Sequence, residues 1–280
     1  MTAGNPEQRP FSCQIITLDS AMERAQTLLS ELQACGIEAE FFPAVDGRRT
    51  YPVLQPDECL DQEAAVHYRM TPLGAAEVGA YLSHFRAIRS AYEAGVKQLC
   101  LFEDDVHLEP DFGTVLAELR QLPAEYELIR FMALKRQPRK LVKPLSAVAG
   151  SEQAYWLTRP LRGTLGGQGL LINRRGMERL IAYGRRIYMP IDKLYDHYWE
   201  TGVHCFVVEP HIIWETAKPT TIPKPDFEPV LPSLKDRLGR TSIKIQRSVH
   251  RRLYLFKHRR AFFPTSKKPP ASIGRSPRIR

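Results

Sequence analysis

The stretch CQIITLDSAMERAQTLLSELQACGIEAEFFPAVDG, residues 13–47, decides the fold class. Its first part, CQIITLD, is a short apolar run rich in β-branched residues, which predicts a strand. Ser20 followed by Glu23 predicts a capping box at the start of a helix, and Gly36 is a typical stop for that helix. The last part, IEAEFFPAVDG, predicts a second strand that ends in a turn. A strand, a helix and a strand in this order predict a parallel sheet in an α/β fold.

The remainder of residues 1–218 continues this alternation. Apolar residues at helical spacing predict a helix over 75–94, which ends at Gly95. We also expect strands at 97–105, 126–134 and 204–213, a strand, turn and helix over 167–184, and a helix over 191–202. Loops are expected at 48–72, with short helical pieces, and at 135–162, which is basic and irregular. The predicted fold is an α/β domain with a mostly parallel central sheet.

The C-terminal part of the chain carries the positive charge. The whole chain has a net charge of +9, and 15 of its Lys and Arg residues lie from Leu231 onward, with Asp236 as the one acid among them. Prolines crowd residues 219–232, which predicts a linker. Residues 233–280 predict a basic amphipathic helical tail with a disordered end. Its apolar face would consist of Leu238, Ile245, Val249, Leu253 and Phe256.

Three partners fit such a tail. It can lie on an anionic membrane surface through residues 233–262, bind nucleic acid, or stay solvated without a partner. The apolar face favours the membrane. Aromatic residues that would stack on single-stranded nucleic acid are sparse, so no nucleic acid is expected.

Several classes of protein are excluded by simple patterns. The five cysteines are widely spaced and contain no CxxC pair, which argues against a disulfide framework and a zinc cluster. No apolar run of about 18 residues is present, so we expect no transmembrane helix. The N-terminus lacks the pattern of a secretory signal, and a cytoplasmic protein is expected. Neither GxGxxG nor GxxxxGK[ST] occurs, so a dinucleotide fold and a P-loop are excluded.

Acidic residues follow three of the predicted strands. Asp19 and Asp46 each follow one, and Glu103, Asp104 and Asp105 close the apolar run LCLFEDDVHL. In open α/β sheets, ligands bind outside the carboxyl ends of the strands, so these acids can meet at one edge. Hard oxygen ligands suit Mg²⁺ or Mn²⁺ that carries a phosphate. The alternative for the acid triplet is an ordinary solvated loop.

Four stretches resemble glycosyltransferase family 25, the family of lipopolysaccharide and lipooligosaccharide glycosyltransferases and of collagen galactosyltransferases. They are IITLDSAMERAQTLLSELQACGIEAEFFPAVDGR, EVGAYLSHFRAI, CLFEDDVHLEPDF, and GQGLLINRRGMERLI followed by MPIDKLYDHYW. The stretches occur in the family's order over residues 13–215. The resemblance implies a GT-A-like nucleotide-sugar fold, UDP-galactose as the usual donor, and an acceptor sugar on a lipid-linked oligosaccharide.

The acids take roles in this interpretation. Alternation along a strand would place Glu103 and Asp105 on one side, as ligands of Mn²⁺ or Mg²⁺, with His211 as a third ligand. Asp104 would instead meet the ribose or sugar hydroxyls of the donor. Asp192, which opens a helix, would be the general base that removes the proton of the acceptor hydroxyl, and the alternative is a plain N-cap.

The other candidates belong to the donor site. Thr17 and Leu18 lie at the end of the first strand. Arg24 can pair with the diphosphate or be solvated on its helix. Asp46 can bind the nucleoside or close an ordinary Asp-Gly turn. Glu77 and His84 share one side of a helix, and they form a structural pair or contact the donor or metal directly.

The sequence thus predicts a transferase that moves a hexose, galactose first, from a UDP-sugar to the core oligosaccharide of a lipopolysaccharide with inversion. It would work at the cytoplasmic face of the inner membrane as a peripheral protein. The alternatives are a transferase of the same fold that uses another UDP-sugar, such as glucose, or a protein acceptor, and a non-catalytic membrane or nucleic-acid adaptor. The oligomeric state stays open.

Overall fold

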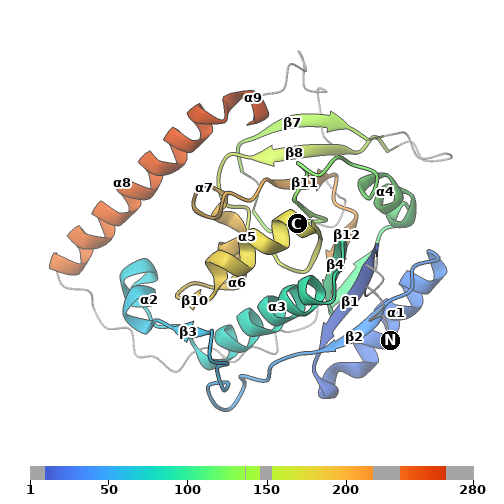
Figure 1. Ribbon diagram of the computed structural model, residues 1–280, viewed down its shortest axis with the longest axis horizontal. Coiled ribbons are helices and arrows are strands. Elements are labelled where there is room, and N and C mark those ends of the chain that lie inside the picture. Colours follow the sequence, from blue (N-terminus) through green and yellow to red (C-terminus); the bar gives the residue numbers. More distant parts are fainter. Residues whose placement is uncertain (1–9, 136, 146–152, 217–233, 263–280) are drawn as a thin grey trace, which may run out of the picture.

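One eight-stranded sheet forms the centre of the protein (Figure 1). The structure is a computed structural model that describes residues 10–135, 137–145, 153–216 and 234–262. In the order of hydrogen-bonded neighbours, the strands are β2 (Glu40–Pro43), β1 (Ser12–Thr17), β4 (Gln98–Glu103), β9 (Gly169–Asn173), β6 (Leu128–Arg130), β11 (Cys205–Glu209), β8 (Trp156–Pro160) and β7 (Arg139–Pro144).

The direction of the strands agrees with the sequence. The pairs β2–β1, β1–β4 and β6–β11 are parallel, and the other four pairs are antiparallel. Six of the eight strands therefore point the same way, and β9 and β8 are reversed. The predicted α/β class with a mostly parallel central sheet is confirmed.

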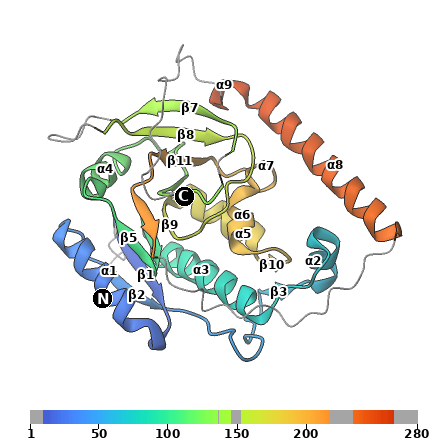
Figure 2. The ribbon, with the colours of Figure 1, turned by 180° about the vertical axis from the view of Figure 1, so that it is seen from behind.

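Helices cover both faces of the sheet, because alternate side chains of a strand point to opposite faces. Leu99 and Leu101 of β4 face the core formed with α3 (Ala75–Glu93), α5 (Arg174–Gly184), α6 (Ile191–Asp196) and α7 (Tyr198–Thr201). Cys100 and Phe102 face the core formed with α1 (Met22–Ala34) and α4 (Phe112–Leu119). Figure 2 shows α1 and α4 to the left of the sheet and α3, α5 and α6 to its right.

Two short ribbons lie outside this sheet. The strands β3 (Cys59–Leu60) and β10 (Arg186–Ile187) are parallel, and β5 (Val106–Leu108) pairs with β12 (Ile213–Glu215) in the antiparallel sense. In the β5–β12 ribbon, Glu215 is the register partner of Val106. The ribbon therefore brings Glu215 close to the acids that follow β4.

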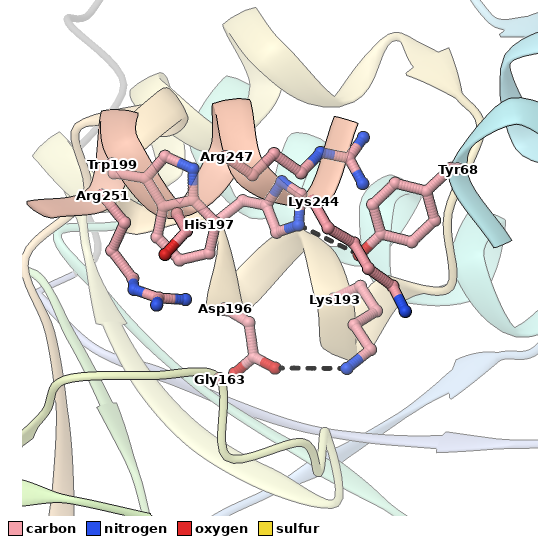
Figure 3. A pocket seen from close by; sticks show the side chains of 10 residues that line it. Tyr68, Gly163, Lys193, Asp196, His197, Trp199, Lys244, Arg247 and Arg251 are labelled. Atoms are coloured by element: carbon pink, nitrogen blue, oxygen red, sulfur yellow. Dashed lines mark hydrogen bonds and ion pairs between the residues drawn. The ribbon is translucent and has the colours of Figure 1, made fainter. Parts of the chain in front are cut away.

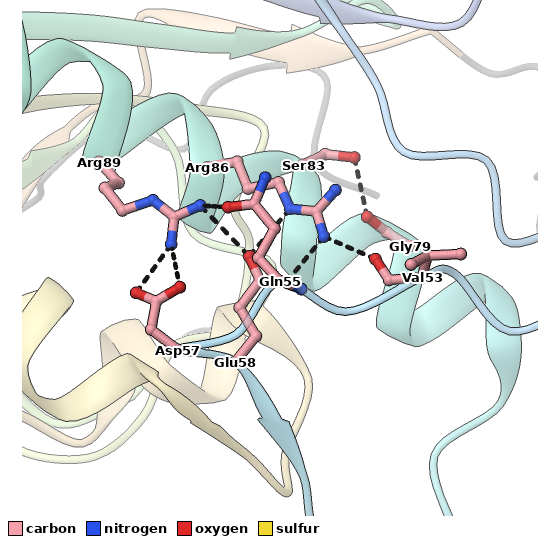
Figure 4. A network of polar contacts seen from close by, with 8 residues as sticks. All are labelled: Val53, Gln55, Asp57, Glu58, Gly79, Ser83, Arg86 and Arg89. Atoms are coloured by element: carbon pink, nitrogen blue, oxygen red, sulfur yellow. Dashed lines mark hydrogen bonds and ion pairs between the residues drawn. The ribbon is translucent and has the colours of Figure 1, made fainter.

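The segment 48–72 contains the helix α2 (Gln62–Arg69) and is tied to α3 by ion pairs (Figure 4). Arg86 donates to both carboxylate oxygens of Glu58, at 2.9 and 2.7 Å, and Arg89 donates to Asp57. Burial alone would raise the pKa of Glu58, but the hydrogen bonds from Arg86 and Gln55 lower it overall. This network is structural, since it fixes a long connection on the outside of α3.

The turn PAVDG packs closely on the first half of α3. The N–H of Val45 donates to the hydroxyl of Ser83 at 2.8 Å. A Cβ atom on Gly79 would lie 2.6 Å from the carbonyl oxygen of Val45, and one on Gly47 would lie 2.0 Å from that of Ala75. Both glycines are therefore required by the close approach of two backbones.

The interpretation of residues 135–162 as irregular is wrong. They contain β7 and β8, which pair with one another at the edge of the sheet. The strand β7, RKLVKP, is only partly buried, and its basic residues suit an edge strand that must not pair further. A half-exposed, basic strand lacks the apolar alternation by which strands are recognised.

Three predicted boundaries also differ. The capping box at Ser20 is absent, because a 3₁₀ turn over Asp19–Ala21 precedes α1 and Ala21 is the N-cap. The helix expected over 191–202 is broken at His197 into α6 and α7. The strand expected over 204–213 ends at Glu209, and the chain then enters β12.

The predicted tail helix is present as α8 (Leu234–Lys257), followed by the short α9 (Arg259–Phe262). It lies against α2 and α7 on the outside of the molecule in both views (Figures 1 and 2). Arg247, Arg251 and Tyr254 face the body. The expected apolar face points away from it, since Leu253 is 60% and Phe256 68% exposed. The predicted linker, the side chain of Leu238 and the predicted disordered end lie outside the described residues.

Candidate active site

The candidate site lies at the carboxyl ends of β1 and β4. These strands are parallel neighbours, and Ile16 is the register partner of Glu103. Thr17 therefore reaches Asp104, and its hydroxyl donates to Oδ2 at 2.8 Å. Arg24, from the first turn of α1, donates to Oδ1 of the same carboxylate at 2.8 Å. Asp104 thus joins β4 to the first βα unit.

Asp105 lies in a different environment from Asp104. The strand β4 ends at Glu103, so strand alternation does not govern where the next two side chains point. The carbonyl of Asp105 accepts from the N–H and hydroxyl of Thr216, at 2.7 and 2.8 Å. Its Oδ1 atom is buried and has no hydrogen-bond partner among the described residues. Among the described residues, it is the one oxygen of the acid triplet that is buried without a partner.

Like charges crowd around Asp105. Burial raises its pKa to about 7, and the carboxylates of Glu103, Asp104 and Glu215 add to the shift. Burial also raises the pKa of Glu215. The charge of Glu103 raises that pKa further, whereas the hydrogen bond from Gln168 lowers it. Four carboxylates thus share this end of the sheet. Within the described residues, one guanidinium, that of Arg24, forms a salt bridge with one of them, Asp104.

Glu103 is linked by hydrogen bonds to α3 and α6. Its Oε1 lies 3.1 Å from Nε2 of His84, and Nδ1 of His84 lies 3.1 Å from the hydroxyl of Tyr195. Burial raises the pKa of Tyr195 well above its ordinary value, so its phenol stays protonated and can donate to Nδ1. The histidine then donates from Nε2 to the carboxylate. This chain connects the acid cluster to the helix that carries Asp192.

A loop at residues 163–167 closes over the same place. The carboxylate of Asp196 accepts from the N–H groups of Thr164 and Leu165, at 2.9 and 3.2 Å, and pairs with the fully buried Arg130 at 3.0 Å. At the other end of the loop, a Cβ atom on Gly167 would lie 3.4 Å from Oε1 of Glu103. The buried Asp196–Arg130 pair therefore holds the loop against the acids.

Asp192 is not an N-cap. Pro190 takes the N-cap position of α6, and no side chain caps that helix. Burial raises the pKa of Asp192, and Asp196 raises it further while Arg130 opposes both. One carboxylate oxygen, Oδ1, is buried without a hydrogen-bond partner among the described residues. Such a carboxylate is a better base than an exposed one, since a raised pKa brings it nearer to neutral pH.

Two of the donor-site candidates have structural partners instead. Glu77 caps α3, because its carboxylate accepts from the N–H of Gly74 at 2.9 Å and pairs with Arg69. It does not contact His84, so the predicted pair is wrong. Asp46 accepts from the N–H and guanidinium of Arg48, which lowers its pKa to about 2. It therefore closes the ordinary turn that was the alternative interpretation.

His211 and Leu18 also differ from the simplest expectation. The Nε2 atom of His211 accepts from the N–H of Ala133 at 3.2 Å, so the neutral ring carries its proton on Nδ1. Burial lowers the pKa of His211 to about 4, which keeps the ring neutral. Neither nitrogen then has a lone pair for a metal, and the expected third ligand is not found there. Leu18 contributes its carbonyl, which accepts from Ala21 at 2.8 Å and starts the 3₁₀ turn.

The structure adds residues that the sequence did not indicate. Glu215 joins the acids because β12 pairs with β5. An acid directly after a short apolar run, IIWE, was a weak signal for it. Tyr195 and Asp196 lie one helical turn beyond Asp192, but Arg130 is a single charge inside a predicted strand and gave no signal at all.

The cluster fits a divalent cation in a specific way. Within the described residues, no three His, Cys, Asp or Glu side chains lie together so as to hold a metal alone. Asp105 offers a buried, unpaired oxygen next to other carboxylates, whose repulsion a cation would relieve. Mg²⁺ and related ions are commonly held by one or two carboxylates, with waters and substrate phosphates as the remaining ligands.

Comparison with curated proteins finds relatives of low sequence identity. The chain is 26% identical over 215 residues to a glycosyltransferase 25 family member of Aedes aegypti, covering 72% of this chain and 34% of that protein. It is 25% identical over 230 residues to procollagen galactosyltransferase 2 of Homo sapiens, again covering 72% and 34%. The chain thus spans about a third of the length of the curated relatives it matches.

Similarity to solved structures is weaker. A Drosophila beta-1,4-galactosyltransferase 7 in complex with manganese, UDP-Gal and xylobiose superposes with a TM-score of 0.43 at 10% identity, covering 82% of this chain and 79% of that one.

A family model described as Glycosyltransferase family 25 (LPS biosynthesis protein) matches residues 12–195. This segment is about two thirds of the chain and includes β1, the acid triplet after β4, and the start of α6 with Asp192. The protein therefore belongs to glycosyltransferase family 25.

Proposed function

We propose that this chain transfers a hexose from a UDP-sugar to a saccharide acceptor and that it needs a divalent cation. The observation that carries the proposal is the cluster of four carboxylates at the end of β4, with its buried, unpaired Asp105 oxygen. In a member of this family, a nucleoside diphosphate is the substrate whose charge suits a metal held there.

The residues of the cluster have separate tasks in this proposal. Asp105, together with Glu103 or Glu215, would hold Mn²⁺ or Mg²⁺. When bound, the cation would supply positive charge to the leaving diphosphate. Arg24, already positioned by Asp104, is the side chain we propose for the diphosphate as well. His84 and Tyr195 keep the carboxylate of Glu103 in place.

Asp192 is the base we propose. An inverting transfer requires a carboxylate that removes the proton of the acceptor hydroxyl while its oxygen attacks the anomeric carbon. Burial raises the pKa of the Tyr195 phenol, and the carboxylates of Glu103 and Asp192 raise it further. Tyr195, which follows Asp192 by one turn of α6, is hydrogen-bonded through His84 to Glu103 of the acid cluster.

The donor and acceptor are proposed from the family. Galactose from UDP-galactose is the first candidate, which the name of the human relative supports. Glucose and a protein acceptor are the alternatives for a transferase of this fold. For the acceptor we propose the core oligosaccharide of a lipopolysaccharide, reached by a peripheral protein at the cytoplasmic face of the inner membrane.

Removing the metal tests the enzymatic proposal. We expect release of UDP from a UDP-sugar in the presence of Mn²⁺, and its loss when EDTA is added, because the diphosphate then leaves without charge neutralisation. A coupled UDP assay over a panel of UDP-sugars measures both the activity and the donor. If no UDP-sugar is bound or turned over with Mn²⁺, the non-catalytic adaptor becomes the better interpretation.

The outward face of α8 supports binding to a membrane surface. Ile245, Val249, Leu253 and Phe256 lie exposed on the side opposite to the body. Basic side chains accompany them along the helix, an arrangement typical of helices that lie in the plane of an anionic membrane. Among the described helices, none is long and apolar enough to cross a membrane.

The double substitution L253S/F256S tests this surface. We expect it to weaken binding to phosphatidylglycerol–phosphatidylcholine vesicles by at least about tenfold, because two large apolar side chains no longer leave water. Co-sedimentation measures the effect. V53S is the matched control, since Val53 is 87% exposed but lies on the body of the protein. If the wild type, L253S/F256S and V53S all bind the vesicles equally, the apolar face of α8 does not contribute to membrane binding.

A further inference from the structure

A small cavity lies between α8 and the segment of α6 and α7, apart from the acid cluster (Figure 3). Its volume is about 240 Å³, below the roughly 300–1,000 Å³ of pockets for whole drug-sized ligands. It suits one chemical group of a ligand rather than a whole sugar nucleotide. Its lining includes the cations Lys193, Lys244, Arg247 and Arg251, the hydroxyl of Ser248 and the carboxylate of Asp196.

The cavity carries an excess of positive charge. Among the described residues, no carboxylate lies within ion-pair distance of Lys244, Arg247 or Arg251. Lys193 is 3.9 Å from Oδ2 of Asp196, but that carboxylate is already bound by Arg130 and by the 163–167 loop.

The acid on α7, Glu200, is ionised and attracts Arg247, but within the described residues it forms no ion pair with a cation of the cavity. Glu200 accepts from His197 and Tyr183, and its pKa is about 2, because these partners outweigh the effect of burial. Four cationic side chains therefore line a single small space, where a bound anion would relieve their mutual repulsion.

The two arginines are held in place by aromatic rings rather than by acids. The guanidinium of Arg247 lies 4.0 Å from the ring centre of Tyr68, and that of Arg251 lies 5.6 Å from the ring centre of Trp199. A guanidinium that contacts an aromatic ring, rather than a carboxylate, keeps its N–H donors for an oxyanion. The hydroxyl of Ser248, on the same side of α8, adds a donor.

The cavity is also connected to the candidate active site. Gly163, at one end of the 163–167 loop, lines it, and a Cβ atom there would lie 2.3 Å from Asp196. Gly167, at the other end, lies against Glu103. Lys193 directly follows Asp192 on α6. A ligand in the cavity therefore lies against the same loop and helix that carry the proposed chemistry.

We propose that this cavity binds a phosphate group. The cluster of cations, the guanidiniums next to aromatic rings and the size of the space all match a phosphate monoester or free phosphate. The proposal does not depend on sugar transfer. The phosphate can belong to a soluble molecule or to a lipid headgroup, and the two sources are separated by experiment.

The test uses the full chain in EDTA, without UDP-sugar. One probe is inorganic phosphate, measured by isothermal titration calorimetry. The other is phosphatidylcholine vesicles that contain phosphatidic acid, measured by co-sedimentation. The variant K193Q/K244Q removes two cations of the cavity, and neither lysine stacks on a ring. The variant K97Q/R185Q is the matched control, because it removes two exposed cations from the body of the protein, outside the cavity and outside α8.

We expect K193Q/K244Q to weaken phosphate binding by at least about tenfold, and the control to change it less than about twofold, because only the former loses charge-assisted hydrogen bonds. If only the vesicles distinguish the variants, the phosphate is that of a lipid headgroup. The proposal is overturned if both variants bind both probes alike. Unchanged thermal unfolding of each variant shows that it is folded, and a failure of UDP-sugar turnover would leave this result unaffected.

Discussion

The substitution Asp105→Asn is expected to lower kcat/KM for sugar transfer by about 10³-fold, or roughly 4 kcal/mol of transition-state stabilisation. The reason is that Asp105 holds the buried, unpaired oxygen of the acid cluster. An amide keeps the shape of the side chain but removes the charge that a divalent cation needs. The measurement is UDP release with saturating Mn²⁺.

The same substitution is expected to stabilise the metal-free protein. Burial and three neighbouring carboxylates raise the pKa of Asp105 to about 7 in the folded state, against an ordinary value of 3.8. Between these values the folded protein binds more protons than the unfolded chain, so stability falls as pH rises from about 4 to 7. Asparagine does not titrate, so the stability of the variant falls less as the pH rises over this range.

Mn²⁺ provides the second readout for Asp105. The wild-type protein is expected to unfold at a higher temperature with Mn²⁺ than with EDTA, since the cation binds the folded state, and Asp105→Asn is expected to lose most of this difference. Asp57→Asn is the control, because Asp57 pairs with Arg89 in the loop outside α3. An Asp105→Asn protein with the same Mn²⁺ response as the wild type would contradict the metal assignment.

The second large effect is expected for Asp192→Asn, which should lower kcat by about 10²–10⁴-fold, the usual contribution of a general base. Its carboxylate is buried, and its pKa is raised by burial and by Asp196. The wild-type rate should therefore fall when the pH drops through this raised pKa, because the protonated acid cannot accept a proton. The variant should lack this acidic limb.

Two further measurements separate a base from a structural role. The affinity of Asp192→Asn for the UDP-sugar should be unchanged, since the role proposed for Asp192 is to accept the proton of the acceptor hydroxyl and not to bind the diphosphate. Its unfolding temperature should not fall, because burial of a neutral amide costs less than burial of a carboxylate. A variant that keeps more than a tenth of the wild-type kcat would exclude Asp192 as the base.

The parts of the site that follow a regular local pattern could be predicted. The β1–α1–β2 unit and β4 show clear apolar runs, and the acids at the end of β4 lie, as predicted, at the carboxyl end of the sheet. The roles that depended on distant partners were less accurate. Glu77 and His84 do lie on one side of α3, but two helical turns separate them, and each has a different partner: Arg69 for Glu77, and Glu103 for His84.

Elements without a local pattern were missed for a related reason. The edge strand β7 is half exposed and basic, so its sequence shows no apolar alternation. The helix α8 was predicted, but its packing on α2 and α7 was not, and its apolar face points away from them. The basic side of α8 forms contacts with aromatic rings of α2 and α7, which the sequence does not place near it.

By itself, the sequence determined the α/β class, the acidic end of β4 and the basic amphipathic character of the tail. Each of these follows from neighbouring residues, because apolar periodicity and charge are properties of a short segment. The tertiary structure decided which acids share one space. Glu215 lies 110 residues after Asp105 and reaches it through the β5–β12 ribbon, and the strength of a charge interaction depends on that distance through space and on burial.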